Sequence, residues 1–244
     1  MNRFFRETLK TISGKAEKPG ELIEPSVLEL ENGIVFEKIL KDGTIEVKLS
    51  KNGEEVFDFL DFAPPGTTLK IHTKKRWGAE INPYIIYVGK GGAIESILSF
   101  LHEAGHLKNS QDVEIASRLK QTVYEEEKKD KNQDLPKSRL RAIAEARKFI
   151  IRIEKDAWAV ALRKARELEK KFNINIFDRL PETEEEKQSG TTVIYKRVRA
   201  FINNHLNDYE DAFLAPLYDV DITKEEMEQL FGQLLSEPAE AQAK

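Results

Sequence analysis

Two histidines, four positions apart, are the residues of this sequence that most directly suggest chemistry. His102 and His106 enclose Glu103, Ala104 and Gly105. Side chains four positions apart on a helix leave the same face, so both imidazole rings can reach one ion. Neutral imidazole is a common zinc ligand, and zinc lowers the pKa of a bound water to about 7. The spacing therefore predicts a zinc ion held by His102 and His106.

Glu103 follows the first histidine directly, so on a helix its side chain is offset from the face that carries the two imidazoles. From that position its carboxylate can take a proton from a water molecule and pass it to a leaving amine. Glu103 is therefore the candidate general base for the hydrolysis of peptide bonds. Ala104 and Gly105 are small, which predicts that another helix or a sheet approaches the motif closely.

A catalytic zinc site has three protein ligands and one open position. Glu154 is the preferred third ligand, because Ala157 and Ala161 follow it at helical spacing and line its face with small side chains. Such a face can pack tightly against the motif helix and bring the carboxylate to the ion. Trp158 is expected either to cover the edge of the site or to belong to the core.

Asp112 is the competing third ligand. The stretch that ends at Asp112 resembles the extended metzincin motif, with Asn109 in place of the glycine of that family. Metzincins also need a methionine turn below the metal, and the only methionines are Met1 and Met227, the latter in a charged helical context. The glutamate is therefore preferred, and the alternative role of Asp112 is that of a helix cap.

A strand, a turn and a helix are expected to position the motif. Residues 84–88 are bulky and apolar and predict an internal strand. Gly89-Lys90-Gly91-Gly92 predicts a tight turn, since its spacing matches neither common phosphate-binding fingerprint. A helix over residues 93–108 follows, ended by Asn109 in a left-handed conformation. Further helices are predicted over residues 113–124, 138–172 (with Ser138 as N-cap), 191–206 and 223–235. Residues 125–137 are predicted to be a mobile loop or a frayed helix end, and residues 179–190 a loop.

The chain before the motif predicts short strands joined by hairpins. Asn32-Gly33, Asp42-Gly43 and Asn52-Gly53 are strong hairpin signals. The predicted strands cover residues 27–30, 34–36, 44–49, 56–62 and 68–72. With the helices, this pattern predicts an α+β fold, in which a small mixed or antiparallel sheet packs on the motif helix and on a long helix that donates the glutamate.

Five regions are expected along the chain. They are an N-terminal amphipathic segment (1–20), a hairpin-rich region (21–66), a zinc-binding core (67–178), a helical C-terminal region (179–236) and a disordered tail (237–244). The acidic stretch over residues 219–235 is a candidate for self-inhibition, because it could fold over the cleft.

Composition limits the other functions. The 244 residues carry a formal net charge of −4, and 34% of them are charged, so no basic field suggests nucleic acid. The absence of cysteine excludes disulfides, thiol catalysis and thiolate ligands. No apolar run is long enough to span a membrane, and the N-terminus lacks the apolar core of a secretory signal. A cytoplasmic protein with a peptide or protein substrate is expected.

The motifs His-Glu-Ala-Gly-His and Glu-x-x-Ala-Trp-x-x-Ala together resemble those of gluzincins, in particular the compact minigluzincins and the repressor-cleaving peptidases of mobile elements. The resemblance covers residues 81–168. It implies a zinc metallopeptidase in which His102, His106 and Glu154 are ligands and Glu103 is the base.

The resemblance also implies an oxyanion-stabilising tyrosine or histidine. The candidates are Tyr195, His205, Tyr209 and Tyr218, none of which lies in a matching motif; His72 is expected at the surface. Residues 113–138 are an insertion that separates the two helices by more than the smallest members of these families need. The region 23–62 and the chain after residue 172 are not covered by the resemblance.

Two alternatives stay open beside an ordinary peptidase. One is a latent or regulatory zinc enzyme that cuts a single partner protein. The other is a partner-binding module with a non-catalytic metal site. The presence of Glu103 favours hydrolysis over the second alternative, because a structural metal site needs no general base.

Overall fold

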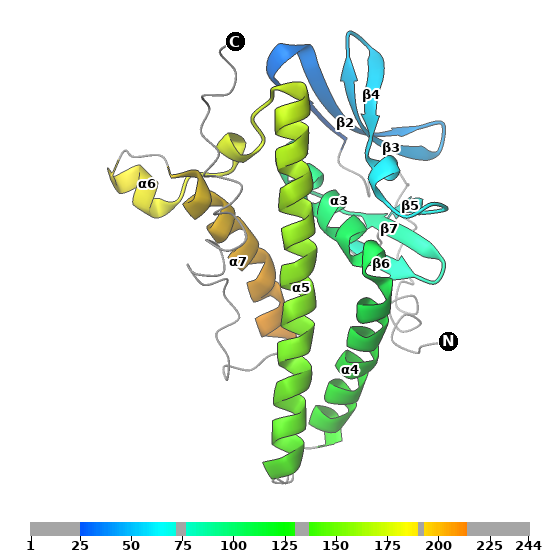
Figure 1. The fold of residues 1–244 in the computed structure, drawn as a ribbon, viewed down its shortest axis with the longest axis vertical. Coiled ribbons are helices and arrows are strands. Elements are labelled where there is room, and N and C mark those ends of the chain that lie inside the picture. Colours follow the sequence, from blue (N-terminus) through cyan, green and yellow to red (C-terminus); the bar gives the residue numbers. More distant parts are fainter. Residues whose placement is uncertain (1–24, 72–76, 130–136, 190–192, 214–244) are drawn as a thin grey trace, which may run out of the picture.

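Two β-sheets and a group of helices give the chain the α+β architecture that the sequence predicts (Figure 1). The computed structural model describes residues 25–71, 77–129, 137–189 and 193–213. Several predictions made from the sequence lie outside these residues: the N-terminal amphipathic segment, the helix over residues 223–235, the tail, and the positions of His72, Tyr218 and Met227.

The hairpin-rich region forms an antiparallel sheet of four strands in sequential order. The strands are β1 (Ser26–Glu29), β2 (Ile34–Lys41), β3 (Thr44–Lys51) and β4 (Glu54–Asp58). Positive φ angles occur at Asp42 and Gly43 between β2 and β3, and at Asn52 and Gly53 between β3 and β4. Such angles belong to two-residue hairpin turns, so these two hairpin predictions are confirmed. Asn32 and Gly33 also have positive φ angles and connect the antiparallel strands β1 and β2 through a short 3-10 turn, which confirms the third hairpin.

The strand predicted over residues 56–62 ends early. β4 stops at Asp58, and Phe59–Phe62 form a 3-10 turn, η2. The Asp58 carboxylate accepts a hydrogen bond from Leu60 N at 2.8 Å. This local contact offers the backbone an alternative to sheet pairing, and the turn buries Phe59 fully.

A second sheet of three strands leads into the motif helix. β5 (Thr68–Ile71), β6 (Gly78–Ile81) and β7 (Tyr84–Val88) have the order β5-β7-β6, with β5 parallel and β6 antiparallel to β7. The central strand β7 buries Ile85, Ile86 and Val88, which confirms the internal strand predicted there. The sequence does not predict β6, because its four residues include only one bulky apolar side chain.

Five helices follow in the part of the chain that the structure describes. They are α3 (Ala93–Lys108), α4 (Ser110–Lys129), α5 (Lys137–Phe172), α6 (Glu184–Ser189) and α7 (Ile194–Phe213). α3 has its predicted limits, whereas α4 and α7 are longer than predicted. α5 already includes Lys137, so the prediction of Ser138 as N-cap is wrong. The loop predicted over residues 179–190 is also partly wrong, since it contains α6 and the end of the 3-10 turn η3 (Phe177–Arg179).

Asn109 does not adopt the left-handed conformation that the sequence predicts for it. Its φ is −105° and its ψ is 38°, and its N–H donates to the carbonyls of Gly105 and His106. α4 begins at the next residue, so Asn109 joins two helices rather than ending one in a left-handed cap.

α4 packs against the first half of α5, and together they extend away from the sheets as the α4–α5 arm (Figure 1). A small hydrophobic cluster, separate from the main core, joins them and contains Ala116, Ile150 and Ile153.

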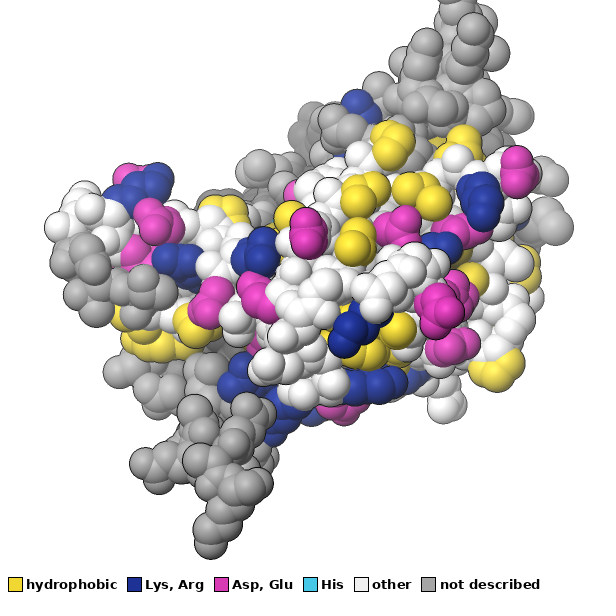
Figure 2. Space-filling model, turned by 90° about the horizontal axis from the view of Figure 1, so that it is seen from above, with side chains coloured by type: hydrophobic (Ala, Val, Ile, Leu, Met, Phe, Trp, Pro, Cys, Tyr) yellow, Lys and Arg dark blue, Asp and Glu magenta, His cyan; other side chains and the backbone are white. Residues whose placement is uncertain are grey.

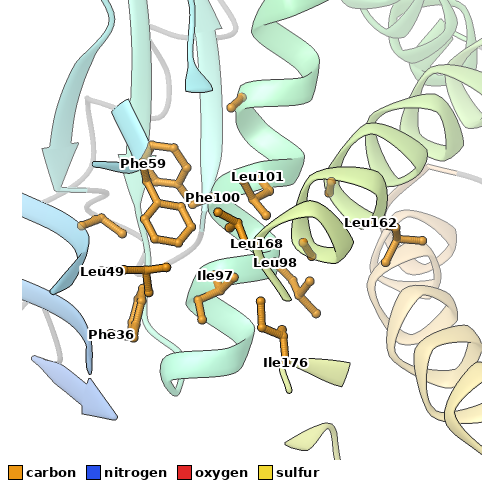
Figure 3. Close-up of a cluster of buried hydrophobic side chains, with 14 of the residues drawn as sticks. Phe36, Leu49, Phe59, Ile97, Leu98, Phe100, Leu101, Leu162, Leu168 and Ile176 are labelled. Carbon is orange, nitrogen blue, oxygen red and sulfur yellow. The ribbon is translucent and has the colours of Figure 1, made fainter. Parts of the chain in front are cut away.

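α3 lies at the centre of the main hydrophobic core. Its residues from Ser96 to Leu107 are all buried, which is typical of a helix covered on every side. Figure 3 shows Phe36, Leu49 and Phe59 on one side of α3, and Leu162 of α5 beyond it on the other. The core therefore holds the motif helix between the four-stranded sheet and α5.

A buried lysine connects the four-stranded sheet to the start of α3. Lys38 of β2 is fully buried, and its ammonium donates to Gly91 O at 2.9 Å and to Gly89 O at 3.4 Å. Trp77 Nε1 donates to Lys90 O in the same turn at 3.2 Å. These bonds satisfy carbonyls that a tight turn leaves unpaired, and they fix the turn from which α3 begins.

The buried pair of Glu186 and Arg197 anchors α7. Arg197 Nε donates to both Glu186 carboxylate oxygens at 3.0 Å, while its Nη1 donates to Asp178 O at 2.8 Å. Thr183 and Glu186 form a capping box at the start of α6. Burial raises the pKa of Glu186, but hydrogen bonds from Thr183, Val193 and Arg197 outweigh it and lower that pKa to about 2.

Replacing Glu186 by glutamine should therefore lower the stability of the folded protein in a pH-dependent way. The reference pKa of the carboxyl is 4.5 and its folded value is about 2, so the charged group stabilises the fold above pH 4.5. That contribution is lost as the pH falls from about 4.5 to about 2. Urea unfolding of wild type and Glu186→Gln should show a difference that shrinks across this window, with Glu184→Gln as an exposed control. A difference that stays constant with pH would contradict the pairing.

None of the described helices is apolar enough over a sufficient length to cross a membrane. On the face shown in Figure 2, acidic and basic side chains are interspersed with hydrophobic ones.

Candidate metal centre

Three buried side chains from two helices meet at one point. His102 and His106 come from α3 and Glu154 comes from α5. The two histidine Nε2 atoms are 3.0 Å apart, and Glu154 Oε2 lies 3.1 Å from Nε2 of His106 and 3.3 Å from Nε2 of His102. The side chains that the sequence proposes as ligands thus meet and could hold a metal ion.

The spacing of these atoms suits a tetrahedral metal ion. With bonds of about 2.0–2.1 Å, the ligand atoms of tetrahedral zinc are about 3.3 Å apart. The three separations of 3.0–3.3 Å come close to that value. Two imidazole nitrogens and a carboxylate oxygen are also a common donor set for zinc, so the residues present fit the ion.

Close contact between the two helices brings Glu154 to the histidines. A Cβ atom on Gly105 would lie 3.0 Å from Ala157 O and 3.3 Å from Ala157 Cα. Ala157 and Ala161 are buried and line this face of α5, as predicted. The small residues on both helices therefore let the backbones approach until the carboxylate reaches the imidazoles.

Burial keeps the His102 ring neutral. Removal from water, together with the neighbouring His106, lowers the pKa of His102 to about 4, although Glu154 acts in the opposite direction. A neutral imidazole is the form that binds a metal ion. At neutral pH, His102 can therefore bind an ion without first giving up a proton.

Glu103 is buried on α3 directly after the first histidine, with an exposed fraction of 9%. It is not one of the three residues whose ligand atoms cluster. Its place on the helix beside the cluster is the one expected of a base that lies next to a metal ion without binding it.

Asp112 does not join the cluster. It lies exposed in the first turn of α4, where a carboxylate is favoured by the helix dipole. The geometry therefore favours Glu154 as the third ligand over the metzincin-like alternative.

Aromatic side chains adjoin the cluster on one side. Trp158 stacks on the His102 ring, with centroids 4.2 Å apart and planes at 27°. His205 and Phe201 of α7 in turn contact Trp158 with centroids 5.2 and 5.7 Å from it. Of the two oxyanion candidates whose side chains are described, His205 thus lies one ring away from a proposed ligand. Tyr195 lies in the first turn of α7.

Sequence reasoning did not assign Phe201 any role. The sequence contains one weak indication of a role for Phe201: it lies four positions before His205, so the two side chains share a face of α7. The same spacing relates Glu154 to Trp158, so one face of α5 supplies both the carboxylate and the indole.

Comparison of the chain with models of known protein families, with curated proteins and with solved structures finds no match.

Replacing Gly105 by alanine should weaken both the fold and metal binding. Forcing a methyl group against the Ala157 backbone costs about 1–3 kcal/mol, which matches or outweighs the roughly 1 kcal/mol that alanine gains over glycine inside a helix. The helices must separate, which widens the gap between His106 and Glu154. Unfolding experiments on the metal-free protein and zinc titration of the variant measure the two effects.

Gly78→Ala is the matched control, since a Cβ there would meet no atom within 4 Å. Equal behaviour of the two variants would show that the helix contact at Gly105 does not set the site.

Proposed function

We propose that this protein is a zinc-dependent peptidase, with His102, His106 and Glu154 as metal ligands and Glu103 as general base. The observation that carries the proposal is the convergence of three buried ligand atoms within 3.3 Å of one another, on a helix that also buries Glu103 directly after the first histidine. A purely structural site gains nothing from this second acidic residue.

The bound zinc ion would act as a Lewis acid toward the peptide carbonyl and lower the pKa of the water that attacks it. Glu103 would accept a proton from that water at its carboxylate and deliver it to the leaving amine nitrogen. The imidazoles of His102 and His106 stay neutral in this scheme and orient the metal. Burial of the whole group keeps bulk water from competing for these contacts.

His205 is the oxyanion-stabilising candidate that we retain. Its Nδ1 lies 2.8 Å from Phe201 O. Since a carbonyl oxygen can only accept a hydrogen bond, Nδ1 carries the proton and donates it. Its Nε2 is then the ring nitrogen left to face a substrate. It donates to an oxyanion only when the ring is doubly protonated, so this role needs a histidinium.

The proposal is tested by comparing wild type with Glu154→Gln and Glu103→Gln. Wild type should bind one zinc ion and cleave peptides from an unfolded-protein library. Glu154→Gln should lose zinc affinity, because the amide replaces an anionic ligand. Glu103→Gln should retain zinc and lose about 10²–10⁴-fold in kcat. Elemental analysis, chelator competition and mass spectrometry of the peptide products are the measurements.

Two variants serve as controls: Glu167→Gln on the exposed side of α5, and Glu95→Gln in the first turn of α3. Both should keep zinc and activity. Unchanged zinc affinity in Glu154→Gln would remove that residue from the ligand set. Bound iron in place of zinc would overturn the assignment of the metal as zinc. A zinc-loaded wild type that cleaves nothing in the library, or a Glu103→Gln variant that keeps every effect of wild type, would favour the partner-binding module.

A further inference from the structure

The orientation of the His102 ring needs an explanation. A histidine that binds a metal through one ring nitrogen usually donates the other N–H to a carboxylate or carbonyl, and this bond fixes the ring. Nδ1 of His102 is buried and has no hydrogen-bond partner among the residues that the structure describes. Within that part of the chain, some other contact must hold the ring plane so that Nε2 faces His106 and Glu154.

Trp158 supplies such a contact. The indole lies nearly flat on the imidazole, at a centroid distance of 4.2 Å and an angle of 27°. It is almost fully buried, so it has little freedom to turn away. Rotation of the His102 ring would break this stack, and the stack therefore restricts the ring to one plane.

Two rings of α7 hold Trp158 in place. Phe201 meets the indole edge-on at 5.7 Å and 88°, and His205 meets it at 5.2 Å and 69°. The centroids of Phe201 and His205 are themselves 4.3 Å apart. The buried pair of Glu186 and Arg197 fixes the first turn of α7, so these two aromatic side chains come from an anchored helix.

The stack also favours the metal-bound state over the metal-free state. Binding of a divalent cation through Nε2 draws electron density from the His102 ring and gives it partial positive charge. The face of an indole attracts positive charge more strongly than that of any other aromatic side chain. Trp158 therefore contributes to metal affinity as well as to ring geometry.

We propose that Trp158 is a positioning residue of the metal centre, which orients His102 by stacking in place of a hydrogen bond, and that α7 belongs to the centre because it holds Trp158. The inference rests on the metal site proposed above. By this inference, the contact that orients the ligand His102 is the face of the Trp158 indole and not a hydrogen-bonding group.

Three variants test it: Trp158→Phe, Trp158→Leu and the control Leu162→Ala, which removes a buried side chain one turn further along α5. Zinc affinity is measured by competition with a chromophoric chelator, and ligand geometry by the visible absorption spectrum of the cobalt-substituted protein. Thermal unfolding of the metal-free proteins reports the loss of core packing separately.

Trp158→Leu should bind zinc about 10–100-fold more weakly than wild type and show an altered cobalt spectrum, in the range found for other outer contacts of metal ligands. Trp158→Phe keeps an aromatic ring on His102 and should therefore keep most of the zinc affinity and a cobalt spectrum close to that of wild type. Leu162→Ala should unfold at a lower temperature, while its folded form keeps the wild-type affinity and spectrum.

Wild-type affinity and spectrum in Trp158→Leu would overturn the inference and leave the proposed peptidase untouched. The inference also fails if Trp158→Phe loses as much affinity as Trp158→Leu, because stacking by a ring would then not be the cause. Equal losses of zinc affinity in Trp158→Leu and Leu162→Ala would reduce Trp158 to a packing residue. A wild-type protein that binds no metal would overturn the metal centre and the inference together.

Discussion

The contact between α3 and α5 at Gly105 is the constraint on which the rest of the molecule depends. A helix pair can approach this closely only where side chains are absent or small, and here glycine faces the Ala157 backbone. The approach places a carboxylate of one helix within 3.1 Å of an imidazole of the other. Two sheets, η2 and the aromatic core surround α3 on its other sides, so neither helix can slide without disturbing the packing of both.

The buried polar cluster is costly to the fold unless something compensates for it. Two imidazoles and two carboxylates lie on or beside a helix that is otherwise surrounded by Leu, Ile and Phe side chains. Removing such groups from water is unfavourable unless they are hydrogen-bonded, paired or bound to a metal. Extensive apolar burial on the remaining faces of α3 offsets this cost. The arrangement is typical of sites where function is kept at the expense of stability.

The parts of the site that depend on residue spacing along one helix could be predicted from the sequence. Helical periodicity predicts that His102 and His106 share a face. It also predicts the limits of α3 and the alanine-lined face of α5 around Glu154. The hairpins were equally visible, because Asp-Gly and Asn-Gly permit the positive φ that a tight turn requires. What escaped prediction depends on contacts between distant elements. β6 is a strand because β7 pairs with it, and Trp158 stacks on His102 because α3 and α5 cross there. Phe201 reaches the indole because α7, which Arg197 anchors, packs against α5.

The unbroken course of α5 has a mechanical consequence. Its 36 residues form one rod of about 54 Å, at 1.5 Å per residue. One end belongs to the α4–α5 arm, Glu154 and Trp158 lie near the middle, and the other end reaches the main core. A continuous helix of this kind resists bending, so a tilt of the arm would also tilt the segment that carries Glu154 and Trp158. The orientation of the arm and the geometry of the cluster are thus linked through one helix.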